Sequence, residues 1–187
     1  MRVIAGRAKG RSLKCREGVE TRPTADRFKE VLFDCIQFQV AGSRFLDLFA
    51  GSGAIAIEAL SRGAKEAVLV EESAEACGII RENLETCGFK SEAMLLCEKV
   101  SPALEKLAVR AEPFDFIFLD PPYHRGLSEE TLAAILRLSA GLLHEKSVGI
   151  AETAADELLI PPPGWSLFKE KRKKVTALLF FRKDENL

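Results

Sequence analysis

The chain lacks several features that would place it outside the ordinary globular proteins. No uninterrupted apolar run reaches the roughly 20 residues that a membrane-spanning helix needs. The opening residues, MRVIAGRAKGRSLK, contain no apolar core of the kind found in secretory signals, so no signal peptide is expected. The cysteines form no CxxC or Cys/His pair, which disfavours a metal site and favours reduced, packed thiols in a cytoplasmic protein. They are Cys15, Cys35, Cys77, Cys87 and Cys97.

The overall charge of −1 conceals an uneven distribution along the 187 residues. Residues 1–30 carry +5 and residues 165–187 carry +4, whereas residues 31–164 carry −10. Basic ends around an acidic middle suggest a polyanion held by the ends, although solvated charged termini are a simpler alternative. The length accommodates one domain with a short appendage and a substantial core.

From residue 45 onward, short apolar runs alternate with segments of helical periodicity. This alternation predicts an α/β fold with a parallel sheet covered on both faces, followed by a C-terminal antiparallel hairpin. The expected strands are Phe45–Phe49, Ala67–Glu71, Ala93–Cys97, Phe114–Asp120, Ser147–Glu152, Trp165–Lys171 and Val175–Arg182. The expected helices lie near 53–62, 73–87, 101–110 and 128–141.

The first residues differ in character from this pattern. The segment RVIAGRAKGRSLKC alternates modestly around two glycines and predicts a short basic hairpin. A helix is expected to begin with Thr24 as its N-cap, because an apolar stripe of helical spacing follows. We therefore divide the chain into a basic hairpin extension, residues 1–23, and a larger domain, residues 24–187.

A glycine-containing turn follows the first expected strand, in the sequence FLDLFAGSGA. Gly51 and Gly53 permit a tight turn and close approach of the backbone to a ligand, and the helix that follows favours a polar or anionic group. The third glycine of the dinucleotide pattern is missing. Asp47 lies in an otherwise apolar strand and must be paired or face a ligand.

The second expected strand ends in two acids, Glu71 and Glu72. Glu71 follows Gly51 by 20 residues, a spacing at which a carboxylate accepts hydrogen bonds from both ribose hydroxyls of an adenosyl ligand. Glu72 is the alternative ligand, but Glu71 is favoured because it closes the strand.

The most specific motif is Asp120-Pro-Pro-Tyr123, which follows the apolar strand beginning at Phe114. Ligands of open α/β sheets bind at the carboxyl ends of strands. The Asp120 carboxylate and the Pro121 carbonyl can each accept one N–H of an amino group on a base, which makes that nitrogen a better nucleophile. Tyr123 can stack on the base. The pattern indicates direct methyl transfer to an exocyclic amino group.

Asp-Pro-Pro-Tyr resembles the motif of amino-directed nucleic-acid methyltransferases. Together with RPTADRFKEVLF (22–33) and LDLFAGSGA (46–54), the chain resembles the RsmD family, the bacterial 16S rRNA guanine-N2 methyltransferases. The opening RVIAG and KGRSL, and LSRGA at 60–64, extend the resemblance over nearly the whole chain.

The resemblance implies a class I methyltransferase fold, which is Rossmann-like with a mostly parallel seven-stranded sheet, and S-adenosyl-L-methionine as cofactor. It also implies one guanine of an assembled or nearly assembled small ribosomal subunit as substrate. We expect a monomer without a metal. The catalytic residues would be Asp120, Pro121, Pro122 and Tyr123. The cofactor-binding residues would be Asp47, Ala50, Gly51, Ser52, Gly53, Glu71, Glu72, Lys99, Val100, Asp120, Thr24 and Asp26. The RNA-binding residues would be Arg2, Arg7, Lys9, Arg11, Arg22, Arg27, His124 and Arg125.

Two positions depart from the family pattern. Relatives often carry Asp or Asn followed by Ala where this chain has Lys99-Val100, so adenine recognition would fall to backbone groups or to Glu98. A Tyr-Gly between the last strands is replaced by Lys-Arg-Lys-Lys at 171–174, which leaves RNA contact at that turn open.

Other functions compete with this interpretation. A DNA amino-methyltransferase acting on adenine N6 or cytosine N4 shares the Asp120 loop, but commonly carries a larger target-recognition region. A non-catalytic RNA-binding assembly factor would not need the intact glycine loop. A pyrimidine C5 methyltransferase would need a cysteine near Asp120, and a NAD-dependent dehydrogenase would need the third glycine.

Overall fold

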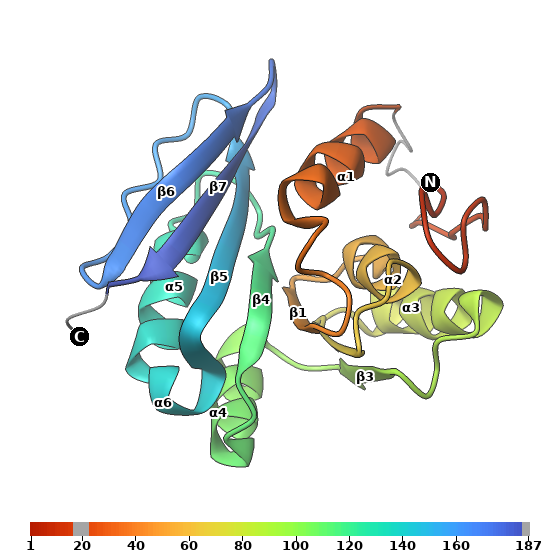
Figure 1. Ribbon diagram of the computed structural model, residues 1–187, viewed down its shortest axis with the longest axis horizontal. Coiled ribbons are helices and arrows are strands. Elements are labelled where there is room, and N and C mark those ends of the chain that lie inside the picture. The colour runs from red at the N-terminus through yellow and green to blue at the C-terminus, as the bar shows by residue number, and fades with distance from the viewer. Residues whose placement is uncertain (17–22, 185–187) are drawn as a thin grey trace. The chain divides into compact units, whose positions relative to one another are not determined.

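The computed structural model describes residues 1–16 and 23–184, and it divides the chain into two compact units, Met1–Glu98 and Lys99–Leu187 (Figure 1). Arg22 lies outside the described residues, as does the side chain of Thr24. The boundary expected between residues 23 and 24 divides the chain differently and stays a prediction. No helix in the described ranges combines the length and apolar character that crossing a membrane requires.

The first unit is built on three parallel strands in the order β3-β2-β1. The central strand β2 pairs with both neighbours, so that Val68 lies opposite Leu46 on one side and Met94 on the other. The residues of β1 and β2 are mostly buried because helices connect and cover the strands. The elements are α1 (Pro23–Ile36), β1 (Arg44–Leu48), α2 (Ala54–Ser61), β2 (Glu66–Val70), α3 (Ala74–Cys87) and β3 (Ala93–Leu96).

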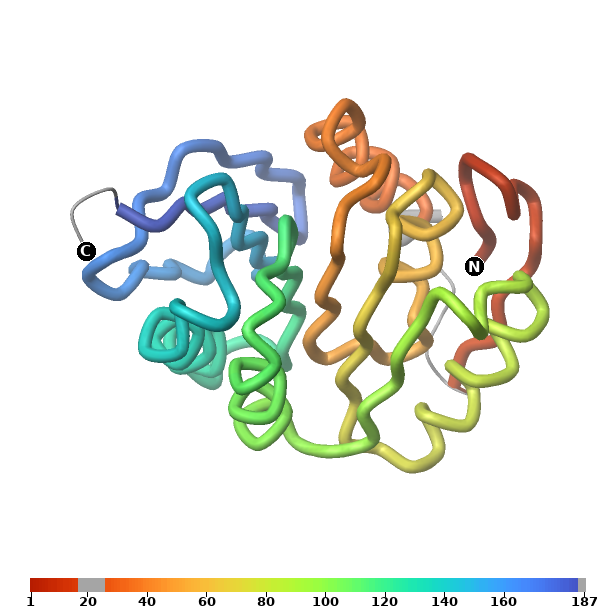
Figure 2. Tube along the Cα trace, turned by 60° about the horizontal axis from the view of Figure 1, so that its bottom comes forward, coloured from red at the N-terminus to blue at the C-terminus, as the bar shows by residue number. Residues whose placement is uncertain are grey.

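The N-terminal arm, residues 1–16, folds back on itself within this unit. Val3 N donates to the Arg11 carbonyl at 2.9 Å, and an antiparallel bridge joins Arg2 and Ser12. The arm lies alongside α3 (Figure 2), where Lys14 N donates to Asn83 Oδ1 at 2.8 Å. The expected hairpin is therefore confirmed, in a form too short to be a pair of regular strands.

The second unit holds four strands in the order β4-β5-β7-β6. β5 runs parallel to β4 and antiparallel to β7, and β6 pairs only with β7 at the edge. β5 is therefore buried between two neighbours and is longer than the expected Ser147–Glu152. The elements are α4 (Val100–Arg110), β4 (Phe114–Leu119), α5 (Leu127–Arg137), α6 (Ser139–Leu142), β5 (Leu143–Ala154), β6 (Trp165–Arg172) and β7 (Thr176–Lys183).

The expected helix at 128–141 is interrupted at Leu138, where α5 ends and α6 begins. Beyond this break, α6 packs closely on α4. A Cβ on Gly141 would lie 2.1 Å from the Ala108 carbonyl oxygen, so the backbones meet with no room for a side chain. On the other helix, the Trp165 indole donates to the Leu132 carbonyl at 2.9 Å and ties β6 to α5.

The predicted α/β class, parallel strands and final antiparallel hairpin are confirmed. Strand and helix boundaries shift by one to a few residues. Thr24 as N-cap is wrong, because α1 begins at Pro23. Proline is favoured at the first helical position, where its missing N–H would be unpaired in any case.

Candidate active site

The glycine turn follows β1 and opens α2. Gly53, with φ of 75°, is the N-cap of α2, and a Cβ there would lie 3.0 Å from the Leu69 side chain. At Gly51 a Cβ would meet nothing within 4 Å, so this stretch of backbone faces open space. Phe49 has a φ of 64°, which is uncommon for an aromatic residue. Unfavourable backbone conformations of this kind concentrate at functional sites.

The Glu71 carboxylate holds this turn from the end of β2. Its Oε2 accepts from Gly51 N at 2.8 Å, and its Oε1 accepts from Ser73 N at 2.8 Å. Each carboxylate oxygen has a second lone pair, so both can accept a further hydrogen bond from a ligand hydroxyl. Glu72 is exposed and forms no such contact within the described chain. The geometry therefore favours Glu71 over Glu72.

Asp47 proves to be paired within the protein. Its side chain is buried, and Oδ2 accepts from Ala56 N in the first turn of α2 at 3.1 Å. The positive end of a helix stabilises a buried carboxylate there. Asp47 thus fixes the angle between β1 and α2, and so supports the glycine turn from beneath.

Asn83 of α3 is a site residue that the sequence analysis missed. Its side chain is buried, donating to the Ser52 carbonyl at 2.9 Å and to the Lys14 carbonyl at 3.0 Å. It therefore joins the glycine turn to the N-terminal arm. Within the described residues, Ser52 is the residue of the glycine turn to which Asn83 forms a hydrogen bond. An asparagine inside a helix carries no local signal for such a role, because its partners are remote in sequence.

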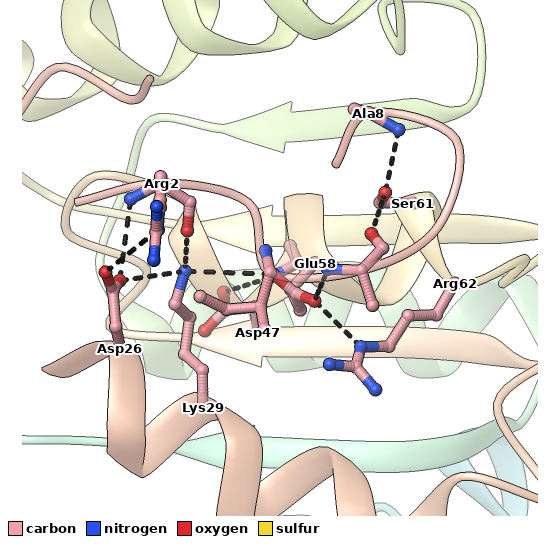
Figure 3. Close-up of polar contacts among 11 residues, drawn as sticks. Arg2, Ala8, Asp26, Lys29, Asp47, Glu58, Ser61 and Arg62 are labelled. Carbon is pink, nitrogen blue, oxygen red and sulfur yellow. Dashed lines mark hydrogen bonds and ion pairs between the residues drawn. The ribbon is translucent and has the colours of Figure 1, made fainter. Parts of the chain in front are cut away.

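The N-terminal signature around Asp26 forms a buried charge cluster with α2 (Figure 3). Lys29 is 1% exposed and lies 3.7 Å from Glu58 and 3.6 Å from Asp26, and it donates to the Arg2 carbonyl. Glu58 is fully buried and also accepts from Ile4 N at 2.8 Å. Burial lowers the pKa of Lys29, and the two carboxylates oppose that effect. The signature thus anchors the N-terminal arm to α1 and α2.

The basic residues expected to bind RNA fall into two groups. Arg7 is engaged in the fold, since it donates to the Leu60 carbonyl at 3.2 Å, pairs with Glu92 and lies over the Phe89 ring. Arg2 pairs with Asp26 at 3.8 Å. The others present exposed side chains, namely Lys9, Arg11 and Arg27. Neutralising Arg7 would therefore disturb packing as well as charge.

Lys99 and Val100, the two positions that depart from the family pattern, begin α4. Lys99 is the N-cap of α4 but its side chain makes no capping hydrogen bond, and it is exposed. An amine cannot accept from the first N–H groups of a helix. Their expected role at the adenine of the cofactor stays a prediction.

Asp120 follows directly after β4 and begins a short loop at the carboxyl end of the strand. Pro121 is buried beneath it, and Pro122 and Tyr123 are exposed. The Tyr123 hydroxyl donates to Glu152 Oε1 at 3.1 Å. The ring is thereby held at its polar end while 37% of the residue stays accessible.

Glu152 is a second residue that the sequence analysis missed. Leu119 of β4 lies opposite Ala151 of the parallel strand β5. The residues that follow them, Asp120 and Glu152, therefore lie at the same end of the sheet. Burial raises the pKa of Asp120 to about 7. Burial and the charge of Asp120 raise the pKa of Glu152 well above its usual range. At neutral pH Glu152 therefore favours its neutral form, whereas Asp120 lies near the midpoint of its titration.

His124 and Arg125 complete the loop. His124 has a φ of 59°, its backbone N–H donates to Glu157 Oε1 at 2.9 Å, and its imidazole lies 3.7 Å from Asp156. Arg125 is exposed. These contacts tie the loop to the segment after β5. Among the described residues, His124 forms no hydrogen bond or ion pair with Asp120, which favours a supporting role over proton transfer.

Comparison with known proteins gives consistent matches. The family model described as Conserved hypothetical protein 95 matches residues 1–182. The Ribosomal RNA small subunit methyltransferase D of Haemophilus influenzae is 35% identical over 186 residues, which is 100% of this chain and 94% of that protein. The Bacillus subtilis protein named "Putative rRNA methyltransferase YlbH" is 40% identical over 167 residues, or 83% of this chain and 89% of that one. The solved structure named "Putative methyltransferase yhhF from Escherichia coli" superimposes with a TM-score of 0.85 at 32% identity, covering 98% of both chains.

Proposed function

Because the chain belongs to the RsmD family, we propose that it transfers a methyl group from S-adenosyl-L-methionine to the exocyclic N2 amino group of one guanine in 16S rRNA. The observation that carries this proposal is the loop after β4, where Asp120 lies beside an accessible tyrosine whose hydroxyl is held by Glu152. The substrate would be the assembled or nearly assembled small subunit, and the enzyme would act as a cytoplasmic monomer.

The residues of the loop suit a poor nucleophile. The lone pair of an amino group on a base is delocalised into the ring, so attack requires the nitrogen to become more tetrahedral. The Asp120 carboxylate accepts one N–H and the Pro121 carbonyl accepts the other, which favours that geometry. Tyr123 stacks on the base, an interaction worth about 1–3 kcal/mol. Asp120 also stabilises the positive charge that develops on nitrogen, and it can receive the proton that is released afterwards.

The first unit offers groups that fit the cofactor. Gly51 leaves open space beside the backbone, a side chain on Gly53 would press on Leu69 from a left-handed backbone position, and each Glu71 oxygen retains a lone pair for a ribose hydroxyl. When bound, the cofactor supplies an electrophilic methyl group on a sulfonium, so the N2–methyl bond forms as the sulfur–methyl bond breaks.

Glu71→Ala and Gly53→Val are expected to weaken S-adenosylmethionine binding about 10- to 100-fold. The first removes charge-assisted hydrogen bonds worth about 1.5–3 kcal/mol, and the second forces a branched side chain into a left-handed conformation against Leu69. Calorimetric titration measures the affinity. Glu72→Ala is the matched control, because its carboxylate is exposed and should leave binding unaltered. Unchanged affinity in both folded test variants would remove this assignment.

Glu152→Gln is expected to retain single-turnover activity within about threefold, whereas Glu152→Ala should lose about tenfold. Glutamine keeps an acceptor for the Tyr123 hydroxyl and matches the neutral form that the raised pKa favours. Alanine leaves the hydroxyl without its buried partner, a loss of roughly 1–3 kcal/mol. If Gln proves as damaging as Ala, Glu152 acts through its negative charge and not through the neutral form that its raised pKa favours.

The substrate class is tested by methyl incorporation from labelled cofactor. Small ribosomal subunits purified from cells that lack the protein should accept the label, and duplex DNA should not. Labelling of DNA in place of subunits would favour an adenine N6 or cytosine N4 methyltransferase. Cofactor binding without labelling of any subunit preparation would favour a non-catalytic assembly factor.

A further inference from the structure

The last two residues of β6 and the turn that joins it to β7, together residues 171–175, lie at the end of the sheet from which the Asp120 loop emerges; we call this segment the turn. Thr176 of β7 pairs with Ala154, at the carboxyl end of β5, and Ala155 N donates to the Val175 carbonyl at 3.0 Å. Two residues further along, Glu157 accepts from His124 N at 2.9 Å. The segment 154–157 therefore borders the turn on one side and the catalytic loop on the other.

This turn is strongly basic. Residues 169–174 contain five cations and one carboxylate, Glu170. Arg172 is committed to the fold, because it pairs with Glu170 at 2.7 Å and donates to the Ala155 carbonyl. The other cations of the turn are exposed and pair with no carboxylate in the parts of the chain that the structure describes. These are Lys171, Lys173 and Lys174.

We propose that Lys171, Lys173 and Lys174 bind backbone phosphates of the RNA strand next to the nucleotide that enters the Asp120 loop. A base that undergoes chemistry must leave its stack, which exposes the flanking backbone to the protein. These lysines lie at the same end of the strands as Asp120, so they are placed to bind that backbone and to neutralise its phosphates. This inference rests on the proposed function and specifies how the second unit holds its substrate.

A different explanation for these lysines is available from the fold. β6 is an edge strand, and lysines on edge strands discourage pairing with other chains. That role is indifferent to RNA, so measurements of RNA binding separate the two explanations.

The test compares two double variants that remove equal charge. The first, Lys173→Gln/Lys174→Gln, alters the turn. The second, Arg137→Gln/Lys146→Gln, alters exposed residues at the end of α5 and the start of β5, at the opposite end of the strands in the same unit. Binding to unmethylated small subunits is measured over a range of salt concentrations, and KM and kcat are measured with the same subunits.

The turn variant should weaken binding about tenfold, and the slope of log affinity against log salt should become shallower by about 1.4, the value for two lost phosphate contacts on a single strand. KM should rise with kcat nearly unaltered, and Lys173→Glu/Lys174→Glu should raise KM further. Equal slopes and equal KM values for the two double variants would overturn the inference. Methylation by the wild-type protein is measured in the same experiment. If it is absent, the proposed function is refuted, whereas the salt slopes still decide whether the turn binds RNA.

Discussion

Asp120→Ala is expected to lower the single-turnover rate of methyl transfer about 10²–10³-fold, the usual loss when one preorganised electrostatic contact is removed. Alanine removes both the hydrogen-bond acceptor that we propose for the guanine amino group and the negative charge that we propose stabilises the developing cation. Affinity for S-adenosylmethionine should stay near normal, so calorimetry on the same variant distinguishes a chemical defect from loss of cofactor. Wild-type rates in this variant would refute the mechanism.

The same residue predicts how the rate depends on pH. An acid whose pKa is raised to about 7 by burial carries its charge only above that pH. The rate of the wild-type enzyme should therefore rise as pH increases through about 7. Asp120→Asn keeps an acceptor oxygen but never ionises, so it should retain a small, measurable rate without this rise. A wild-type profile that is flat across neutral pH would show that the ionisation of Asp120 is not required.

Glu58→Ala is expected to lower the free energy of unfolding by about 3–5 kcal/mol, the cost of removing one partner from a buried ion pair. Glu58 is fully buried and holds Lys29, Arg62 at 2.8 Å, and the backbone N–H groups of Ile4 and Ala5. Without it, a buried ammonium loses a partner and the N-terminal arm loses its attachment to α2. Urea denaturation of both proteins gives the difference.

Glu66→Ala is the matched control for this prediction. Glu66 is a glutamate of the same unit, paired with Arg44 at 2.7 Å, but its side chain is 35% exposed. Partly exposed pairs contribute about 0–1 kcal/mol, so its loss should be small. Equal destabilisation by the two substitutions would show that the buried cluster is not what holds the arm.

The parts of the molecule that could be predicted from sequence are those with a local signal. Apolar runs interrupted by helical periodicity predicted the order of strands and helices along the chain, and Glu71 and Asp120 were recognised because each follows an apolar run. Glu71 illustrates this, because its spacing from Gly51 predicted a carboxylate placed for ribose hydroxyls. The structure adds a contact that the spacing did not predict, with Glu71 Oε2 at 2.8 Å from Gly51 N.

The parts that could not be predicted depend on partners remote in sequence. Asp47 was expected to be paired or to face a ligand, and only the fold identifies its partner as the first turn of α2. Asn83 and Glu152 received no attention because nothing beside them in the chain marks them, and their partners lie 31 and 29 residues away. Arg7 was assigned to RNA from its charge alone, and only the fold reveals Glu92 and Phe89 around it.

We propose guanine N2 in the RNA of the small subunit as the methylated group. The most direct measurement is the identity of the methylated nucleoside after small subunits from cells lacking the protein are incubated with the purified enzyme and cofactor, and the RNA is digested for mass spectrometry. We expect N2-methylguanosine at a single position with the wild-type protein, and nearly none with Asp120→Ala. A methyl group on adenine N6, on cytosine N4 or on a pyrimidine carbon would contradict it.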